Sequence, residues 1–151
     1  MGLAVNTLNR REFLQCGLAV GGGLLLPSLV GGAPSIHVGG PLAGGVYYTR
    51  ESPGLWASLV REHLPKLEKA TGAGGSLIIN VSTDHEMDGY DHYIVKHTLL
   101  DRKFKVLGHK TFDPRRDRPI SKYALLPGYQ GPVYALSMCN RHDLWLEGIV
   151  V

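Results

Sequence analysis

Seven short segments rich in apolar and β-branched residues, separated by turn residues, constrain the fold of this chain more than any other feature. Segments of this length and spacing predict β-strands joined by turns. They cover residues 66–69, 76–82, 92–100, 103–112, 120–126, 132–138 and 145–151. At 151 residues the chain has room for one domain of this kind. We therefore expect an all-β fold, an antiparallel sandwich or barrel.

One short helix is expected before the strands. Ser52-Pro53 is a typical helix start, with serine as the cap and proline at the first helical position. Leu59 and His63 continue at helical spacing, and Pro65 stops the helix. His63 is therefore predicted at, or just past, the helix end.

The first 33 residues indicate an export signal. Paired arginines, Arg10-Arg11, are followed by Phe13-Leu14 and a mildly apolar run over residues 16–30, which is typical of a twin-arginine signal. The run is short and interrupted by glycines, so no stable membrane span is expected after cleavage. The alternative is an amphipathic N-terminal helix.

Cleavage is expected between about residues 33 and 43, which leaves a flexible segment over 34–45 that includes a solvated His37. The functional domain is predicted over 46–151. Such a signal predicts a periplasmic protein and makes the twin-arginine translocase a partner. A net charge of +3 is too small to suggest nucleic acid as a partner.

Cys139 would be the only cysteine of the exported chain. An unpaired thiol in an oxidising compartment needs protection by burial or by a metal. Cys139 and His142 can offer a thiolate and an imidazole from one tight turn, although a lone cysteine is more often an inert apolar residue.

Three further histidines, His63, His85 and His92, lie at boundaries of the predicted elements, where metal ligands are common. Taken one by one, each could equally be an ordinary exposed histidine. Taken with Cys139 and His142, they favour a metal site. His97 is five residues after His92 and is expected on the opposite face of the strand, and His109 is expected at the surface.

These residues resemble the iron-site signatures of the superoxide reductase family, which includes neelaredoxin and the C-terminal domain of desulfoferrodoxin. The resemblance rests on His85-Glu86-Met87, on His92-Tyr93-Ile94 and on the sequence CNRHDLW over 139–145. In addition, Arg61-Glu62-His63-Leu64-Pro65 is similar to the family segment Glu-Lys-His-Val-Pro. The similarity runs from about residue 57 to the C-terminus.

The resemblance implies an immunoglobulin-like antiparallel β-sandwich and one mononuclear iron. It assigns the four equatorial imidazoles to His63, His85, His92 and His142, and the axial thiolate to Cys139. The implied reaction is the one-electron reduction of superoxide to hydrogen peroxide, in which ferrous iron becomes ferric. A separate electron-donor protein is implied, and its identity and any homo-oligomer stay open.

Two details differ from the family pattern. His85 and His92 are separated by one residue more than is typical. The cation before His63 is Arg61, followed by Glu62, where the family has glutamate and then lysine. We expect Arg61 and Glu62 to be catalytic, Arg61 by attracting superoxide and Glu62 by reaching the open metal position. Arginine is a poor proton donor because its pKa is too high.

Three other functions remain open from the sequence. The Arg61-Glu62 order is compatible with an iron redox or sensor module of low turnover. A cupredoxin-like copper carrier also uses Cys-x-x-His, but no methionine follows shortly after His142. The third is a metal-free binding module.

A basic region has two interpretations: a solvated sheet face and loop, or a surface that steers an anionic substrate or docks an acidic redox partner. Its members are Lys103, Lys105, Lys110, Arg115, Arg116, Arg118 and Lys122.

Overall fold

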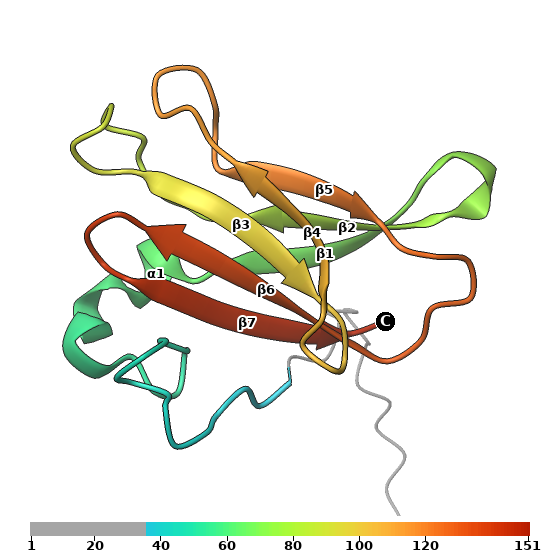
Figure 1. Ribbon diagram of the computed structural model, residues 1–151, viewed down its shortest axis with the longest axis horizontal. Helices are drawn as coiled ribbons and strands as arrows, with labels where there is room; N and C mark the ends of the chain where they lie inside the picture. The colour runs from blue at the N-terminus through green and yellow to red at the C-terminus, as the bar shows by residue number, and fades with distance from the viewer. Residues whose placement is uncertain (1–35) are drawn as a thin grey trace, which may run out of the picture. The chain divides into compact units, whose positions relative to one another are not determined.

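Two antiparallel sheets make up the fold (Figure 1). The computed structural model describes residues 36–151, so the twin-arginine signal expected over residues 1–33 lies outside the described part. One sheet has the strand order β1-β2-β5 and the other has the order β4-β3-β6-β7. The strands are β1 (Lys66–Thr71), β2 (Leu77–Ser82), β3 (Ile94–Leu100), β4 (Val106–Thr111), β5 (Ile120–Ala124), β6 (Pro132–Cys139) and β7 (Leu144–Val150), with a 3-10 turn η2 (Ala73–Gly75) between β1 and β2.

The core lies between the two sheets. Ile79 and Val81 of the three-stranded sheet pack in one buried cluster with Leu99, Val133 and Ile149 of the four-stranded sheet. Burying an aliphatic side chain of this size contributes about 1.5–3 kcal/mol. The predicted all-β, immunoglobulin-like antiparallel sandwich with one short helix is confirmed.

The helical segment consists of a 3-10 helix, η1 (Gly54–Leu59), and one turn of α-helix, α1 (Val60–His63). Leu64 is extended, with φ −68° and ψ 124°, because the residue before a proline is disfavoured in the helical region. Ser52 does not cap the helix, contrary to expectation. The helical segment begins at Gly54, Pro53 is in the cap position, and no side chain caps the segment. The N–H of Ser52 donates to Thr49 Oγ1. No helix in residues 36–151 has the length and apolarity needed to cross a membrane.

Contacts with the sandwich begin before residue 46, the expected start of the domain. The N–H of Ile36 donates to Gly148 O at 3.2 Å, and Val38 is buried. Tyr48 then pairs with the edge of β7, donating to Leu144 O at 2.8 Å. His37 is exposed, as expected.

A β-bulge interrupts β3 close to its start. Ile94 pairs with Cys139 and Lys96 pairs with Met138, so Val95 is an extra residue on this strand. Because of it, Ile94 and His97 are both completely buried, although strict alternation would place them on opposite faces.

Candidate metal centre

The five predicted ligands come from four separate segments and meet at one end of the sandwich. His63 is the last residue of α1, His85 lies in the loop after β2, and His92 lies two residues before β3. Cys139 ends β6, and His142 lies in the turn between β6 and β7. One ligand atom from each lies within 4.8 Å of all the others.

Local hydrogen bonds shape the turn that carries Cys139 and His142. The N–H of Cys139 donates to Asp143 O at 2.9 Å, and Asp143 has the left-handed φ of 60° that aspartate tolerates. The side chain of Asn140 accepts from the N–H of Tyr93 at 2.9 Å and donates to Asp91 O at 3.1 Å. These bonds tie the turn to the segment that carries His92.

Four ring nitrogens lie along three sides of an approximate square. His85 Nε2 lies 3.0 Å from His92 Nε2, His92 Nε2 lies 3.0 Å from His142 Nδ1, and His142 Nδ1 lies 2.9 Å from His63 Nε2. Nitrogens about 2.1 Å from a central ion in a square plane are about 3.0 Å apart along each side. The spacing therefore fits four imidazoles that share one metal ion.

Hydrogen bonds alone do not explain this arrangement. His92 Nε2 faces two other ring nitrogens, and one ring nitrogen carries either a single proton or a single lone pair. It can therefore make one direct hydrogen bond in the ring plane and not two. Lone pairs directed at a shared cation would satisfy all four nitrogens.

The sulfur of Cys139 completes the cluster. Its Sγ lies 3.8 Å from both His85 Nε2 and His142 Nδ1, and it accepts the N–H of Arg141 at 3.4 Å. Burial raises the pKa of the Cys139 thiol, and the Arg141 N–H acts in the opposite direction. A metal would hold the thiolate form, because ligation requires the thiol to lose its proton.

The outer ring nitrogens of two histidines fix the orientation of their rings. His63 Nδ1 lies 3.1 Å from Leu59 O, and His85 Nδ1 contacts the carbonyl oxygen of Glu86. A proton on each Nδ1 leaves Nε2 as a lone pair that faces the centre.

The same histidines are held neutral. Burial lowers the pKa of His63 to about 4, and the positive charge that His85 would carry adds to this effect. Burial also lowers the pKa of His85. Neutral imidazoles are the form that binds a metal.

A cavity of about 420 Å³ opens beside the cluster. Arg61 and Glu62 line it together with His85 and His92, and both of these charged side chains are exposed. The Glu62 carboxylate raises the pKa of His85 slightly, against the larger effect of burial. The two predicted catalytic residues thus lie at the entrance to the cluster.

Trp56 contacts the site, which was not predicted from the sequence. The edge of its ring lies against His142, with centroids 4.8 Å apart and the planes at 68°. Its indole N–H donates to Asp143 Oδ2 at 3.1 Å. The only sign of this contact in the sequence is the presence of a tryptophan in the predicted helix. Trp145, within the Cys-to-Trp motif, donates its indole N–H to His142 O at 2.8 Å.

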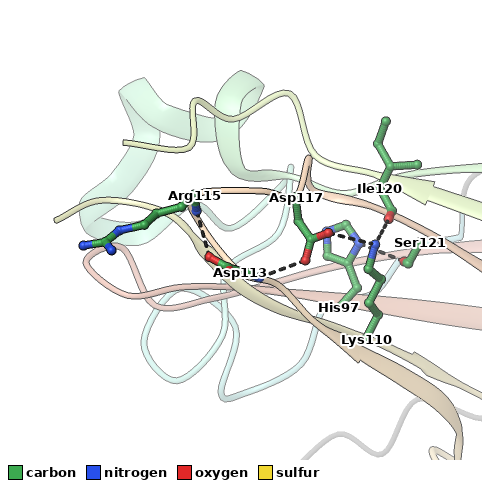
Figure 2. Close-up of polar contacts among 7 residues, drawn as sticks. All are labelled: His97, Lys110, Asp113, Arg115, Asp117, Ile120 and Ser121. Carbon is green, nitrogen blue, oxygen red and sulfur yellow. Dashed lines mark hydrogen bonds and ion pairs between the residues drawn. The ribbon is translucent and has the colours of Figure 1, made fainter. Parts of the chain in front are cut away.

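The other histidines lie outside the cluster. His97 is buried in the core between the sheets, and His109 is exposed on β4. In the basic region, acidic residues of the same loop neutralise part of the charge (Figure 2). Lys110 Nζ lies 3.9 Å from Asp117 Oδ1, and Arg116 Nε lies 3.7 Å from Asp113 Oδ2.

The fold and the cluster together define a class: a β-sandwich with four imidazoles and one thiolate that could hold a metal ion. No protein-family model and no curated protein matches the sequence. The solved structure of superoxide reductase (neelaredoxin) from Ignicoccus hospitalis is 27% identical, with a TM-score of 0.59 over 72% of this chain and 95% of that one. A variant of that protein has the same identity and a TM-score of 0.61, over 72% and 94% of the two chains.

The superoxide reductase (neelaredoxin) from Archaeoglobus fulgidus in the reduced form is 21% identical, with a TM-score of 0.52. The alignment covers 60% of this chain and 89% of the Archaeoglobus chain, and it shows that the two folds are alike. These similarities support the superoxide reductase family for this chain.

Proposed function

We propose that the protein is an exported superoxide reductase, an oxidoreductase that reduces superoxide to hydrogen peroxide at one mononuclear iron. The observation that carries this proposal is the near-square of ring nitrogens with a cysteine sulfur beside it. His63, His85, His92, His142 and Cys139 would hold the iron. The likeness to the Ignicoccus superoxide reductase supports the choice of metal and substrate.

The reaction consumes one superoxide, one electron and two protons for each hydrogen peroxide formed. Held by these residues, an iron ion would supply the electron by changing from ferrous to ferric, and the Cys139 thiolate would push electron density toward it. The electron is restored by a donor protein that remains to be identified. The chain itself contributes Arg61 at the entrance, beside the carboxylates Glu62, Asp84 and Glu86 of the same cavity, and access for water.

Arg61 and Glu62 are the catalytic residues in this proposal. Arg61 places a positive charge at the cavity that leads to the cluster, and such a charge raises the local concentration of an anion such as superoxide. Arginine is in general a poor proton donor. The two protons therefore come from water in the open cavity, and the exposed Glu62 can accept or relay them.

We further propose that the protein acts in the periplasm. The twin-arginine pattern over residues 8–15 supports export of the folded chain by the twin-arginine translocase. Loading before export would favour iron, since copper binds most nitrogen and sulfur sites more tightly. Cys139 is buried and free, which suits a compartment where exposed thiols oxidise.

A cupredoxin-like copper carrier is less well supported. Sites of that kind use two imidazoles and one thiolate, whereas this cluster has four imidazoles.

Metal analysis of the purified protein, followed by superoxide generated in a pulse, tests the proposal. We expect one iron per chain and oxidation of the ferrous protein by superoxide at a rate close to diffusion. Copper in place of iron would contradict the iron site. Bound iron that superoxide oxidises far more slowly than diffusion would instead identify a redox or sensor module.

A further inference from the structure

A group of four polar side chains crosses the core next to the metal centre. Thr83 Oγ1 lies 2.9 Å from His97 Nε2 and 2.9 Å from Ser137 Oγ. His97 Nδ1 lies 2.9 Å from Ser121 Oγ, and Figure 2 shows these two residues side by side. None of the four is more than 4% exposed. We call this group the His97 network.

The network joins both sheets. His97 lies on β3 and Ser137 on β6, whereas Ser121 lies on β5 and Thr83 directly follows β2. Two backbone contacts reinforce it: the hydroxyl of Tyr123 donates to His97 O at 3.2 Å, and the N–H of Thr83 donates to Pro119 O at 3.0 Å. The network therefore sets the position of one sheet relative to the other at this level.

Each member of the network has a partner. Burial lowers the pKa of His97 to about 4, so its ring is neutral at neutral pH, with one nitrogen as donor and one as acceptor. One ring N–H and two of the hydroxyls can then donate in sequence along the chain. Apolar side chains would fill the same core without the cost of desolvating polar groups. A fully satisfied polar network, however, holds its members in one defined arrangement.

Two members lie two residues from predicted metal ligands. Thr83 precedes His85 in the same loop, and Ser137 precedes Cys139 on β6. Ser137 and Cys139 are both buried, whereas Met138 between them is exposed, so both face the core. The Thr83–Ser137 hydrogen bond thus links the segment that carries His85 to the strand that carries Cys139.

We propose that Thr83, held in place by His97, is a positioning residue for the metal centre and keeps His85 in register with Cys139 through its hydrogen bond to Ser137. This inference rests on the proposed iron site. The alternative is that the His97 network stabilises the fold only. The positioning role and the stabilising role predict different results. If the network positions the ligands, loss of a hydroxyl weakens metal binding more than another mutation that lowers global stability by the same amount.

Iron-loaded full-length protein and three variants separate these roles. Thr83→Val keeps the side-chain shape and removes the hydroxyl, whereas Thr83→Ser keeps the hydroxyl. Val133→Ala is the control, because Val133 is a buried residue of β6 far along the strand from Cys139. The measurements are the rate of iron transfer to a coloured chelator, the visible spectrum of the oxidised form, and the urea midpoint of the metal-free protein.

We expect Thr83→Val to lose iron about tenfold faster than Thr83→Ser and Val133→Ala, since changes to groups that orient metal ligands cost about 10–100-fold. Its oxidised spectrum should shift as well. Rates of iron loss that follow the urea midpoints in all three variants would overturn the proposal. If Thr83→Val does not fold, Ser137→Ala replaces it in the same comparison.

The iron measurements do not depend on turnover. Iron-loaded protein that fails to react with superoxide would contradict the proposed function and leave the positioning test intact. Wild-type protein that binds no iron would overturn both.

Discussion

His63 and His97 are the same side chain at the same degree of burial, but their ring nitrogens face different partners. Neither residue is exposed to solvent, and burial lowers the pKa of both to about 4. His63 Nε2 faces another ring nitrogen at 2.9 Å, whereas both nitrogens of His97 face hydroxyl groups. Burial and pKa therefore do not distinguish a candidate ligand from a structural histidine, and the facing atoms do.

Replacing His63 should produce the largest effect. His63→Ala removes one corner of the nitrogen square, and we expect iron affinity to fall by about 100-fold or more, since even groups that only orient ligands are worth about 10–100-fold. Metal content after gel filtration measures this. His97→Gln should keep stoichiometric iron, and so should the control His109→Ala on the exposed face of β4. A fully loaded His63→Ala protein would remove His63 from the ligand set.

Leucine at the two positions should change the stability of the metal-free protein to different extents. His97→Leu leaves the Ser121 hydroxyl without its partner and takes one partner from Thr83. Each buried group left unpaired costs about 1–3 kcal/mol, so we expect a loss on the order of 3 kcal/mol. His63→Leu removes one hydrogen bond, from Nδ1 to Leu59 O, and a second nitrogen that faces only another ring nitrogen. Because a single hydrogen bond contributes about 1 kcal/mol, its free energy of unfolding should fall by about 1 kcal/mol or less.

Urea denaturation of the two metal-free variants at neutral pH measures this difference. The same loss in both variants would show that His63 is held by the metal-free fold as firmly as His97 is.

The contribution of the His97 network to the free energy of unfolding should depend on pH and should be lost in acid. The folded pKa of His97, about 4, is below its ordinary value of 6.5, so the unfolded chain binds the extra proton. Its contribution is complete above about pH 6.5 and is lost as the pH falls toward 4. Between pH 6.5 and 5, the free energy of unfolding of metal-free wild type should fall by about 1.5 kcal/mol more than that of His97→Gln.

Urea titrations at the two pH values give this difference, because the other histidines contribute equally to both proteins. His109→Gln serves as the control and should behave as wild type. An identical acid slope in His97→Gln would show that His97 titrates normally in the folded chain.

Arg61 should give the smallest effect, because it lies at the open, solvated side of the His63 cluster. Arg61→Ala should slow the reaction with superoxide by about three- to tenfold at low salt and reduce its salt dependence. Arg102→Ala, an exposed cation in the turn after β3, is the matched control. Equal rates for both variants at low and high ionic strength would show that Arg61 does not attract superoxide to the cluster.

Much of the fold was predictable from the sequence because its strands carry strong local signals. β2, β6 and β7 begin and end within one residue of the predicted segments. The cluster was recognisable because Cys139 and His142 lie in one turn and the resemblance names the other three histidines.

The remaining features depend on contacts between distant residues. Trp56 meets Asp143 across 87 residues, a contact that no local pattern encodes. The Ser52 cap was wrong because the helical segment begins at Gly54, which puts Pro53 in the cap position. The inward direction of His97 follows from the extra residue at Val95, which alternation does not reveal.

The bulge at Val95 makes β3 tolerant of a change in its length at this one position. Removing Val95 would leave Ile94 opposite Cys139 and Lys96 opposite Met138, which is a regular antiparallel register. Ile94 and His97 would then lie two residues apart, so regular alternation would keep both side chains in the core. A single-codon deletion there would therefore keep the metal centre and the His97 network in register, at the expense of the hydrogen bond that the N–H of Phe112 donates to Val95 O at 3.0 Å.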